Sequence, residues 1–418
     1  MRRVHIVGAG LAGLSAAVRL TGAGGRVMLS DAATQAGGRC RSYHDPQLDM
    51  TIDNGNHLVL SGNRAVRDYL ALIGASDRLA GPDDARFAFI DLRDGARWTL
   101  RPNEGRLPWW IAARSRRVPG TRARDYLALA GLLRAGGDAT IVDTIPVAGV
   151  LWERLVDPFL LSALNTPSIE GSAKLAGAVV RESLAAGGRA CRPRIADPHL
   201  GAAFVDPATA FLARHDAAPR LGRRLRGIGF SGDRVTSLAF ADGEEAIAAG
   251  EPVILAVPPW VAEGLVPDLV VPDAHHAIVN AHYRIAPPAG ALAMIGVIGG
   301  TAHWIFTFPD RISVTISAAD ALRDEGREAL AARIWADIQA ALGLSAAMPP
   351  WRIVREQRAT FAATPAQERR RPPAATRWRN LFLAGDWTAT GLPATIEGAL
   401  RSGETAARLA LAIAAPAR

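Results

Sequence analysis

The chain has 418 residues, of which 49% are hydrophobic and 21% charged, and these globular values exclude a disordered protein. This length predicts two domains, while the two cysteines, Cys40 and Cys191, exclude a disulfide framework and a cysteine-based metal site, as expected in a reducing cytoplasm. The net charge of +8 comes almost wholly from arginine, but no recognition motif accompanies it, so we expect no nucleic-acid partner.

The first predicted element is a buried parallel strand that ends in glycines at the G-x-G-x-x-G spacing. Gly8 permits the tight turn, Gly10 lets backbone approach a diphosphate, and Gly13 allows the following helix to pack closely. A second strand ends at Asp31, where a carboxylate is expected to accept hydrogen bonds from ribose hydroxyls. The pattern predicts a dinucleotide site at a helix N-terminus.

Two polar, glycine-containing loops follow. Gly37 and Gly38 allow backbone to pass close to a ligand, and Arg39 could pair with a phosphate, although an ordinary turn with a solvated arginine is the alternative. Residues 53–57 form the second loop, ahead of a short apolar strand. His57 ends that loop, and a lone histidine is more often a structural hydrogen-bonding group than a catalyst.

Residues 63–203 change in character to helical segments rich in alanine, leucine and arginine. Within them, Trp109 and Trp110 precede five arginines and a predicted apolar helix at residues 126–133. Tryptophan at headgroup depth beside arginine is typical of a membrane interface. Two core tryptophans beneath a solvated charged face are the equally weighted alternative.

The α/β character returns at residues 204–267. Two segments, residues 223–230 and 234–240, predict a hairpin, and residues 253–257 predict a buried strand that rejoins the first sheet. Residues 285–309 contain no charged side chain and could span a bilayer, but Gly299 and Gly300 interrupt the run. We therefore expect a buried hairpin of residues 291–298 and 303–308.

The C-terminal third completes the pattern. An alternating strand at residues 312–316 and an amphipathic helix near residues 325–342 resemble a substrate-domain sheet with a covering helix. A later strand ends in Gly385-Asp386, and Ile396 begins the apolar face of a final helix. An acid at the carboxyl end of a parallel strand lies where doubly wound sheets bind ligands.

Together these stretches resemble the FAD-binding pattern of phytoene desaturases, protoporphyrinogen oxidases and flavin amine oxidases. The resemblance implies an α/β fold: a Rossmann-type FAD-binding domain (residues 1–62, 204–267 and 378–418) and a discontinuous α+β substrate domain (residues 63–203 and 268–377). It implies FAD as the cofactor. The implied cofactor-binding residues are Gly8, Gly10, Leu11, Ala12, Gly13, Asp31, Gly37, Gly38, Arg39, Gly55, Asn56, Leu225, Ala256, Gly385, Asp386, Thr395 and Ile396.

Within that superfamily the chain is most similar to the squalene-associated branch, the hydroxysqualene dehydroxylases of hopanoid biosynthesis. The similarity is carried by residues 53–57, 164–167, 299–306, 356–361 and 385–388. It implies reduction of an allylic C30 isoprenoid alcohol to squalene by reduced FAD, with an unknown electron donor, in a cytoplasmic protein with possible peripheral membrane contact. Asp31 departs from the glutamate usual in the superfamily, which shortens the reach to ribose.

Such a reaction expels hydroxide, so a positioned acid would accelerate it. His57 and Glu397 are the catalytic candidates because the family motifs place them near the flavin, although each could bond only backbone. A desaturase that moves hydride in the opposite direction is one alternative, and a prenyl-lipid binding module without turnover is another. Amine oxidation is disfavoured because the only lysine, Lys174, lies in the helical region.

Overall fold

The computed structural model describes residues 3–414. Residues 1–2 and 415–418, which the sequence analysis assigned to the FAD-binding domain, lie outside the described part. Its first sheet contains four parallel strands in the order β19-β13-β1-β2. In register, Ile6 of β1 pairs with Ile254 of β13, and Ile254 pairs with Phe382 of β19. The strands are β1 (Arg3–Val7), β2 (Arg26–Ser30), β13 (Val253–Leu255) and β19 (Leu381–Leu383). Both ends and the middle of the chain therefore meet in one sheet, as predicted.

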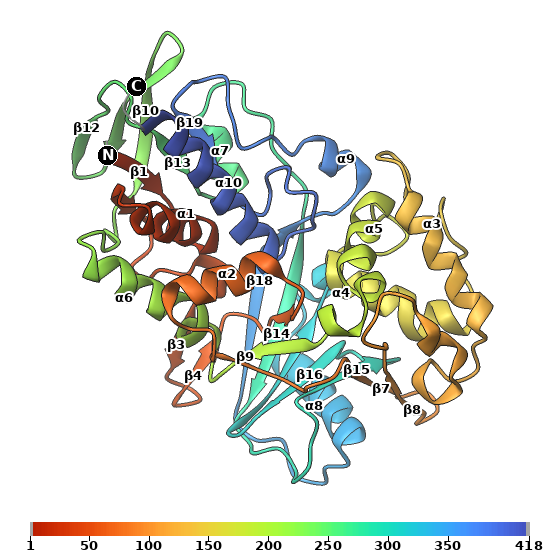
Figure 1. The fold of residues 1–418 in the computed structure, drawn as a ribbon. Coiled ribbons are helices and arrows are strands. Elements are labelled where there is room, and N and C mark those ends of the chain that lie inside the picture. Colours follow the sequence, from red (N-terminus) through yellow and green to blue (C-terminus); the bar gives the residue numbers. More distant parts are fainter. Residues whose placement is uncertain (1–2, 415–418) are drawn as a thin grey trace.

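Helices α1 (Leu11–Gly22) and α10 (Ile396–Ala414) pack against each other beside this sheet (Figure 1). The two helices are so close at Gly403 that a Cβ on this residue would lie 2.2 Å from the backbone oxygen of Ala12. Helices α2 (Arg64–Ile73) and α6 (Asp206–Arg214) share the same hydrophobic core. Helix α2 thus packs with the dinucleotide-binding elements, although the predicted boundary at residue 63 assigns it to the substrate segment.

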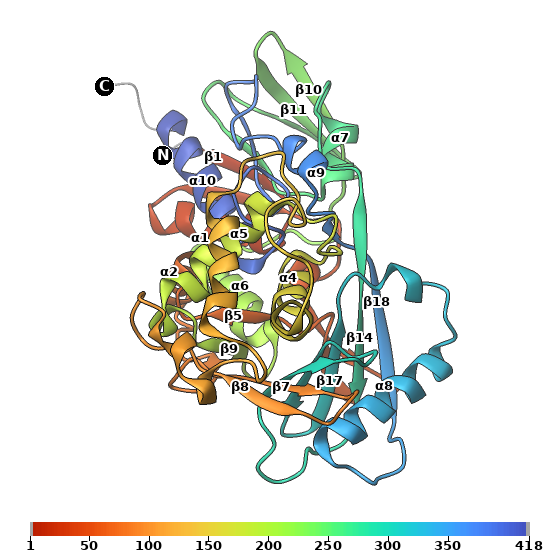
Figure 2. The same cartoon turned by 90° about the vertical axis from the view of Figure 1, so that its right-hand side faces the viewer.

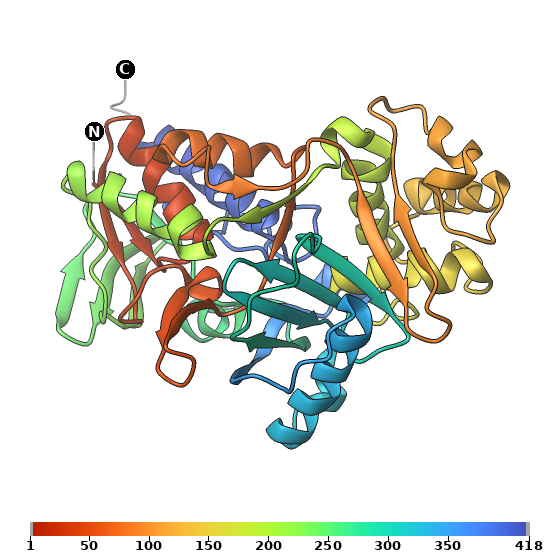
Figure 3. The same cartoon turned by 90° about the horizontal axis from the view of Figure 1, so that it is seen from below.

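A seven-stranded sheet in the order β18-β14-β17-β16-β15-β7-β8 forms the second layer (Figure 3). Its strands are β7 (Phe87–Asp91), β8 (Arg97–Leu100), β14 (His275–Tyr283), β15 (Met294–Ile298), β16 (Trp304–Phe308), β17 (Arg311–Ile316) and β18 (Trp351–Phe361). Strands β15 and β16 are the predicted antiparallel hairpin. One face packs on α8 (Arg327–Leu342), where Tyr283 donates to the carbonyl of Ala331 at 2.7 Å. The other face packs on the helical region (Figure 2).

Three smaller sheets complete the fold of the described residues. The predicted hairpin of residues 223–240 is present as an antiparallel pair, β10 and β11, extended by β12. The strands are β3 (Ser42–Asp45) with β4 (Met50–Asp53), β5 (Leu58–Leu60) with β9 (Pro193–Ala196) and β6 (Leu79–Ala80), and β10 (Leu225–Ser231) with β11 (Arg234–Phe240) and β12 (Gly243–Ala246).

The remaining helices gather mainly at the end of the molecule farthest from the termini (Figure 1). The apolar helix predicted at residues 126–133 is instead a 3-10 helix, Ala123–Ala128, followed by a short α-helix, because Tyr126 turns inward to bond backbone. The remaining α-helices are α3 (Leu129–Arg134), α4 (Asp157–Leu164), α5 (Ala173–Glu182), α7 (Pro259–Leu265) and α9 (Pro365–Arg369). Across residues 3–414, no helix is both long and apolar enough to cross a bilayer.

Candidate functional site

The predicted glycine turn connects β1 to α1, and each glycine has its own reason to lack a side chain. Gly8 has φ = +110°, and a Cβ there would lie 2.3 Å from the backbone oxygen of Ala256. A Cβ on Gly13 would lie 1.8 Å from the oxygen of Gly8. At Gly10 a Cβ would meet no protein atom within 4 Å. The packing of the protein therefore explains Gly8 and Gly13, whereas at Gly10 there is room for a ligand to approach the backbone.

The second glycine pair lies directly on this turn. Gly37 has φ = +104° and donates its N–H to the carbonyl of Ala9 at 2.8 Å, and a Cβ on Gly38 would lie 3.3 Å from the Cα of Gly10. Gly10 is the N-cap of helix α1, which has neither a side-chain cap nor an acidic residue in its first turn of Leu11, Ala12 and Gly13. An uncompensated helix N-terminus flanked by glycine backbone suits an anion such as a diphosphate.

The carboxylate of Asp31 accepts hydrogen bonds from the backbone of the turn and of the loop that follows β2. One carboxylate oxygen, Oδ2, accepts from the N–H of Ala9 at 2.5 Å, and the other, Oδ1, accepts from the N–H of Ala33 at 2.7 Å. Each oxygen has a second lone pair. The expected contact with ribose thus stays a prediction, but the structure shows a role that spacing did not reveal, since Asp31 fixes the backbone between Gly8 and Gly10.

Arg39 and Asp386 come together although 347 residues separate them. The guanidinium donates to Oδ1 of Asp386 at 2.6 Å and to the carbonyl of Ala359 at 2.5 Å. Desolvation of the guanidinium lowers the pKa of Arg39, but the charge of Asp386 and its hydrogen bond, together with the charges of Cys40 and Glu356, raise it by more, and the pKa of Arg39 is raised overall. The sequence predicted both residues for the cofactor site, and the structure places them in one ion pair beside it.

A buried arginine that the sequence analysis missed holds the loop after Asp386. Arg371 donates to the carbonyls of Asp386 and Thr388, at 3.0 and 2.5 Å, and pairs with Glu368 at 2.6 Å. Its guanidinium is fully buried. Arg371 ends a run of three arginines that resembles a solvated surface, so the only sequence signal is the acid three residues earlier.

His57 lies close enough to Arg39 and Asp386 for their charges to act on it. Burial, assisted by the positive charge of Arg39, lowers the pKa of His57 to about 4, and Asp386 offsets this only in part. His57 is therefore a neutral imidazole at pH 7. It can donate a hydrogen bond from one ring nitrogen, but it is not an imidazolium acid.

The structure assigns Glu397 a different position from the one expected of a catalytic acid. Its two carboxylate oxygens accept from the backbone N–H groups of Ala65 and Val66, both at 3.0 Å, at the start of α2. Arg401 also donates to Oε1, at 2.6 Å. Glu397 is 3% exposed and cannot approach a substrate without uncapping α2. These contacts favour the alternative, in which Glu397 bonds only structural groups, and a catalytic role for Glu397 stays a prediction.

A buried amide network fixes the loop that contains Gly55 and Asn56. A Cβ on Gly55 would lie 2.9 Å from Nδ2 of Asn280. Asn56 donates to Oγ1 of Thr315 at 3.2 Å, and that hydroxyl donates to Oδ1 of Asn280 at 2.8 Å. Oδ1 of Asn56 is buried without a partner in the described part of the chain. Such an acceptor suits a polar group of a bound cofactor. Neither Asn280 nor Thr315 carried a sequence signal.

The remaining predicted cofactor residues border the same region. Ala256 donates its N–H to the carbonyl of Val7 at 2.7 Å, and its own oxygen faces Gly8. Leu225 begins the hairpin strand β10 and is buried. Oγ1 of Thr395 accepts from the N–H of Gly398 at 3.0 Å, immediately before α10. Ile396 is the first residue of α10.

Gly385 follows β19, where it has φ = +151° and lies against Trp387, whose indole donates to the carbonyl of Val257 at 3.0 Å. The polar groups of the whole site are therefore glycine backbone N–H groups, a helix N-terminus, an arginine and the unpartnered amide oxygen of Asn56. These groups fit a ligand that carries a diphosphate, with the diphosphate at the start of α1.

The chain matches the model of the family described as flavin containing amine oxidoreductase, over residues 11–411. It is 53% identical to hydroxysqualene dehydroxylase of Zymomonas mobilis and 54% identical to that of Rhodopseudomonas palustris, in each case over 98% of this chain and 99% of the relative. The Sinorhizobium fredii hydroxysqualene dehydroxylase is 52% identical over 98% of both chains.

Solved structures with the same fold include a putative protoporphyrinogen oxidase from Exiguobacterium, with a TM-score of 0.69 at 17% identity, and a putrescine oxidase variant, with a TM-score of 0.71 at 15% identity. Each alignment covers 98% of this chain and 99% of the other. The predicted α/β class is thereby confirmed. The chain belongs to the flavin-containing amine oxidoreductases and, among these flavin-dependent oxidoreductases, to the hydroxysqualene dehydroxylase family.

Proposed function

We propose that this protein removes the hydroxyl group of hydroxysqualene to give squalene, with FAD as its cofactor. The identity of 52–54% to three hydroxysqualene dehydroxylases over essentially the full chain carries this proposal. The glycine turn supports FAD, because the open space at Gly10 and the free start of α1 suit a diphosphate. The bound, reduced flavin would supply the two electrons that, with protons, convert the carbon–oxygen bond into a carbon–hydrogen bond and water.

The residues of this chain would hold the cofactor at both ends. Gly8, Gly10 and Gly13 with the start of α1 would receive the diphosphate, and Asp31 would accept from ribose through its remaining lone pairs. Arg39 follows the glycine pair that lies on the turn and would exchange part of its contact with Asp386 for a phosphate oxygen. These assignments extend to Leu11, Ala12, Gly37 and Gly38 around the turn, to Leu225, Ala256, Gly385 and Asp386 along the sheet, and to Gly55, Asn56, Thr395 and Ile396 around the ring.

At the reacting centre His57 is the favoured candidate from sequence. Its neutral ring would donate a hydrogen bond to the hydroxyl of the substrate, and protonation of the leaving oxygen would come from another group or from water. Apolar walls would exclude the water that quenches an allylic cation. The substrate is an apolar C30 isoprenoid, so we further propose a cytoplasmic protein that meets the membrane surface to collect it.

Anaerobic incubation of the photoreduced holoenzyme with hydroxysqualene, followed by chromatography for squalene, tests this function. We expect squalene to form in proportion to the flavin that is reoxidised. A holoenzyme with tightly bound flavin that leaves hydroxysqualene unchanged would refute the dehydroxylase proposal. If the protein instead oxidises squalene or a related isoprenoid, with flavin reduction, the desaturase direction is correct. A protein that takes up no FAD would favour the binding module.

A further inference from the structure

A second candidate site lies on the surface of the helical region. We define the Trp109 surface as Arg101, Arg106, Leu107, Trp109, Arg114 and Arg116, which belong to the connection between β8 and α3. We propose that the Trp109 surface docks on anionic lipid headgroups of a membrane and that its cavity receives a headgroup phosphate. This inference rests on the proposed function in one respect only, because that function supplies the reason for a membrane partner.

The two neighbouring tryptophans have different environments. Trp110 is 3% exposed and packs edge-on against Tyr126, with ring centroids 5.3 Å apart. Trp109 is 54% exposed, and Leu107 beside it is 78% exposed. The sequence analysis left two alternatives, a membrane-interface cluster or two core tryptophans. In the structure one tryptophan, Trp110, lies in the core and the other, Trp109, lies at the surface. Trp110 anchors the segment in the core, so that Trp109 and Leu107 are held at the surface.

The segment around Trp109 carries far more positively than negatively charged residues. Residues 97–124 contain eight arginines and a single acidic residue, Glu104. Glu104 is already paired with Arg192 at 2.9 Å. Within residues 3–414, no carboxylate forms an ion pair with Arg101, Arg106 or Arg114. The guanidinium groups of these three arginines are thus available to an external anion.

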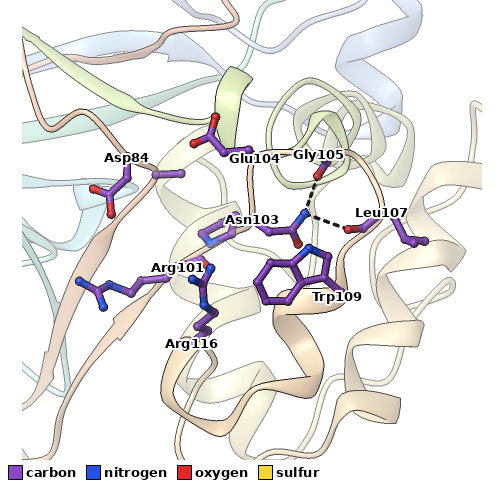
Figure 4. Close-up of a pocket in the computed structure, with 10 residues that line it drawn as sticks. Asp84, Arg101, Asn103, Glu104, Gly105, Leu107, Trp109 and Arg116 are labelled. Carbon is purple, nitrogen blue, oxygen red and sulfur yellow. Dashed lines mark hydrogen bonds between the residues drawn. The ribbon is translucent and has the colours of Figure 1, made fainter.

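A cavity of about 500 Å³ is lined in part by residues of the Trp109 surface (Figure 4). Arg101, Arg116, Leu107 and Trp109 are among its lining residues. The guanidinium of Arg116 stacks over the ring of Trp109, with its carbon 4.8 Å from the centroid. The side chain of Asn103 donates to the carbonyls of Gly105 and Leu107, at 2.9 and 3.0 Å, which fixes the loop that forms one wall.

The acidic groups of the cavity already have arginine partners. Asp84 also lines it, and its carboxylate is paired with Arg86 at 2.6 Å; that hydrogen bond, with a smaller effect of the charge of Arg101, lowers the pKa of Asp84. Glu104 is paired with Arg192. Two arginines beside a stacked tryptophan and an exposed leucine therefore combine a cationic site that can hold a phosphate with apolar side chains that can enter the acyl-chain boundary.

A membrane explains this combination better than a nucleic acid or an acidic protein does. Arginine alone would attract any polyanion, but Leu107 and Trp109 gain free energy only when they leave water. Tryptophan is favoured at headgroup depth, and arginine is favoured beside anionic lipid. The Trp109 surface also lies at the end of the molecule opposite the termini, so that the dinucleotide-binding sheet would face away from the bilayer (Figure 1).

Flotation of the full-length holoenzyme with vesicles tests this proposal. Wild-type protein should float with phosphatidylcholine vesicles that contain phosphatidylglycerol, bind pure phosphatidylcholine weakly, and be released by salt. The Arg101→Gln/Arg116→Gln variant should lose about tenfold or more of its binding, because each arginine near an anionic surface adds several-fold. The matched control is Arg26→Gln/Arg214→Gln, which removes the same charge from exposed residues of the dinucleotide-binding elements and should bind like wild type.

The apolar contribution is tested separately with Leu107→Ser/Trp109→Ser. This variant should bind vesicles more weakly than wild type, and lowering the salt concentration should not restore its binding. Equal flotation of wild type and Arg101→Gln/Arg116→Gln on phosphatidylglycerol vesicles would overturn the proposal. So would preferential binding to single-stranded RNA that the same variant abolishes. If inorganic phosphate binds in the cavity but leaves the flotation of the protein unchanged, the cavity takes a free anion and the headgroup assignment is refuted.

Activity distinguishes failure of docking from failure of the proposed function. All variants should convert hydroxysqualene dispersed in detergent at the wild-type rate, since none of these residues contacts the candidate flavin site. With substrate embedded in anionic vesicles, only the variants of the Trp109 surface should slow. Absence of turnover in detergent for every protein, wild type included, would refute the function and leave the flotation result standing.

Discussion

Substitution of Glu397 by glutamine separates a structural from a catalytic role. The carboxylate accepts from two backbone N–H groups at the start of α2, and it also accepts from Arg401. Glutamine keeps the volume and one acceptor oxygen but replaces the other oxygen with an NH2 group. One donor of the cluster is then left facing another donor in a site that is 3% exposed.

The size of the effect follows from these contacts. Hydrogen bonds to charged groups contribute about 1.5–3 kcal/mol, and loss of a helix cap costs about 0.5–2 kcal/mol. We expect Glu397→Gln to lower the free energy of unfolding by about 2–4 kcal/mol, since one strong bond is lost and the cap is weakened. Glu404→Gln is the matched control on the same helix. Glu404 pairs with Arg64 at 2.8 Å on the surface, so its loss should cost about 0–1 kcal/mol.

Urea unfolding of the holoenzymes gives the change in stability, and turnover per bound flavin, measured where all variants are folded, gives the change in chemistry. Glu397→Gln should shift the unfolding midpoint and keep kcat close to wild type. Removal of a general acid typically costs about 10²–10⁴-fold in rate. A Glu397→Gln enzyme with a wild-type midpoint and a kcat reduced to that extent would show that the capping interpretation is wrong.

Two further predictions concern the glycine turn and acid stability. Gly13→Ala should abolish flavin binding, because its Cβ would lie 1.8 Å from a backbone oxygen, whereas Gly22→Ala, in open space on the same helix, should retain the absorbance of bound flavin; equal flavin content in both would contradict this. Burial lowers the pKa of His57 and His303 to about 4 and that of His282 to about 3, so the unfolded chain binds protons first as the pH falls below 6.5. Stability should therefore be constant above that pH and fall between about pH 6.5 and 4, in urea titrations, with a shallower fall in His303→Gln; a midpoint independent of pH over this range would refute the assignment.

The sequence was most informative where a function depends on a few consecutive residues. The G-x-G-x-x-G spacing predicts the turn because backbone geometry at Gly8 and close packing at Gly13 are local requirements that exclude any side chain. The hairpin of β15 and β16 was also predictable, since Gly299 and Gly300 interrupt an apolar run too abruptly for a helix. The family resemblance added the cofactor and the reaction class, which no local pattern contains.

Tertiary structure decided the role of each side chain, because that role depends on partners hundreds of residues away. Asp386 and Glu397 both look like acids near a ligand in the sequence, but the fold pairs one with Arg39 and uses the other to cap α2. Trp109 and Trp110 are identical neighbours, yet in the fold Trp110 packs on Tyr126 and is buried, whereas Trp109 is exposed. The sequence by itself thus determined the architecture of the cofactor turn, whereas burial and long-range pairing decided which charged and aromatic groups remain free to meet a ligand or a membrane.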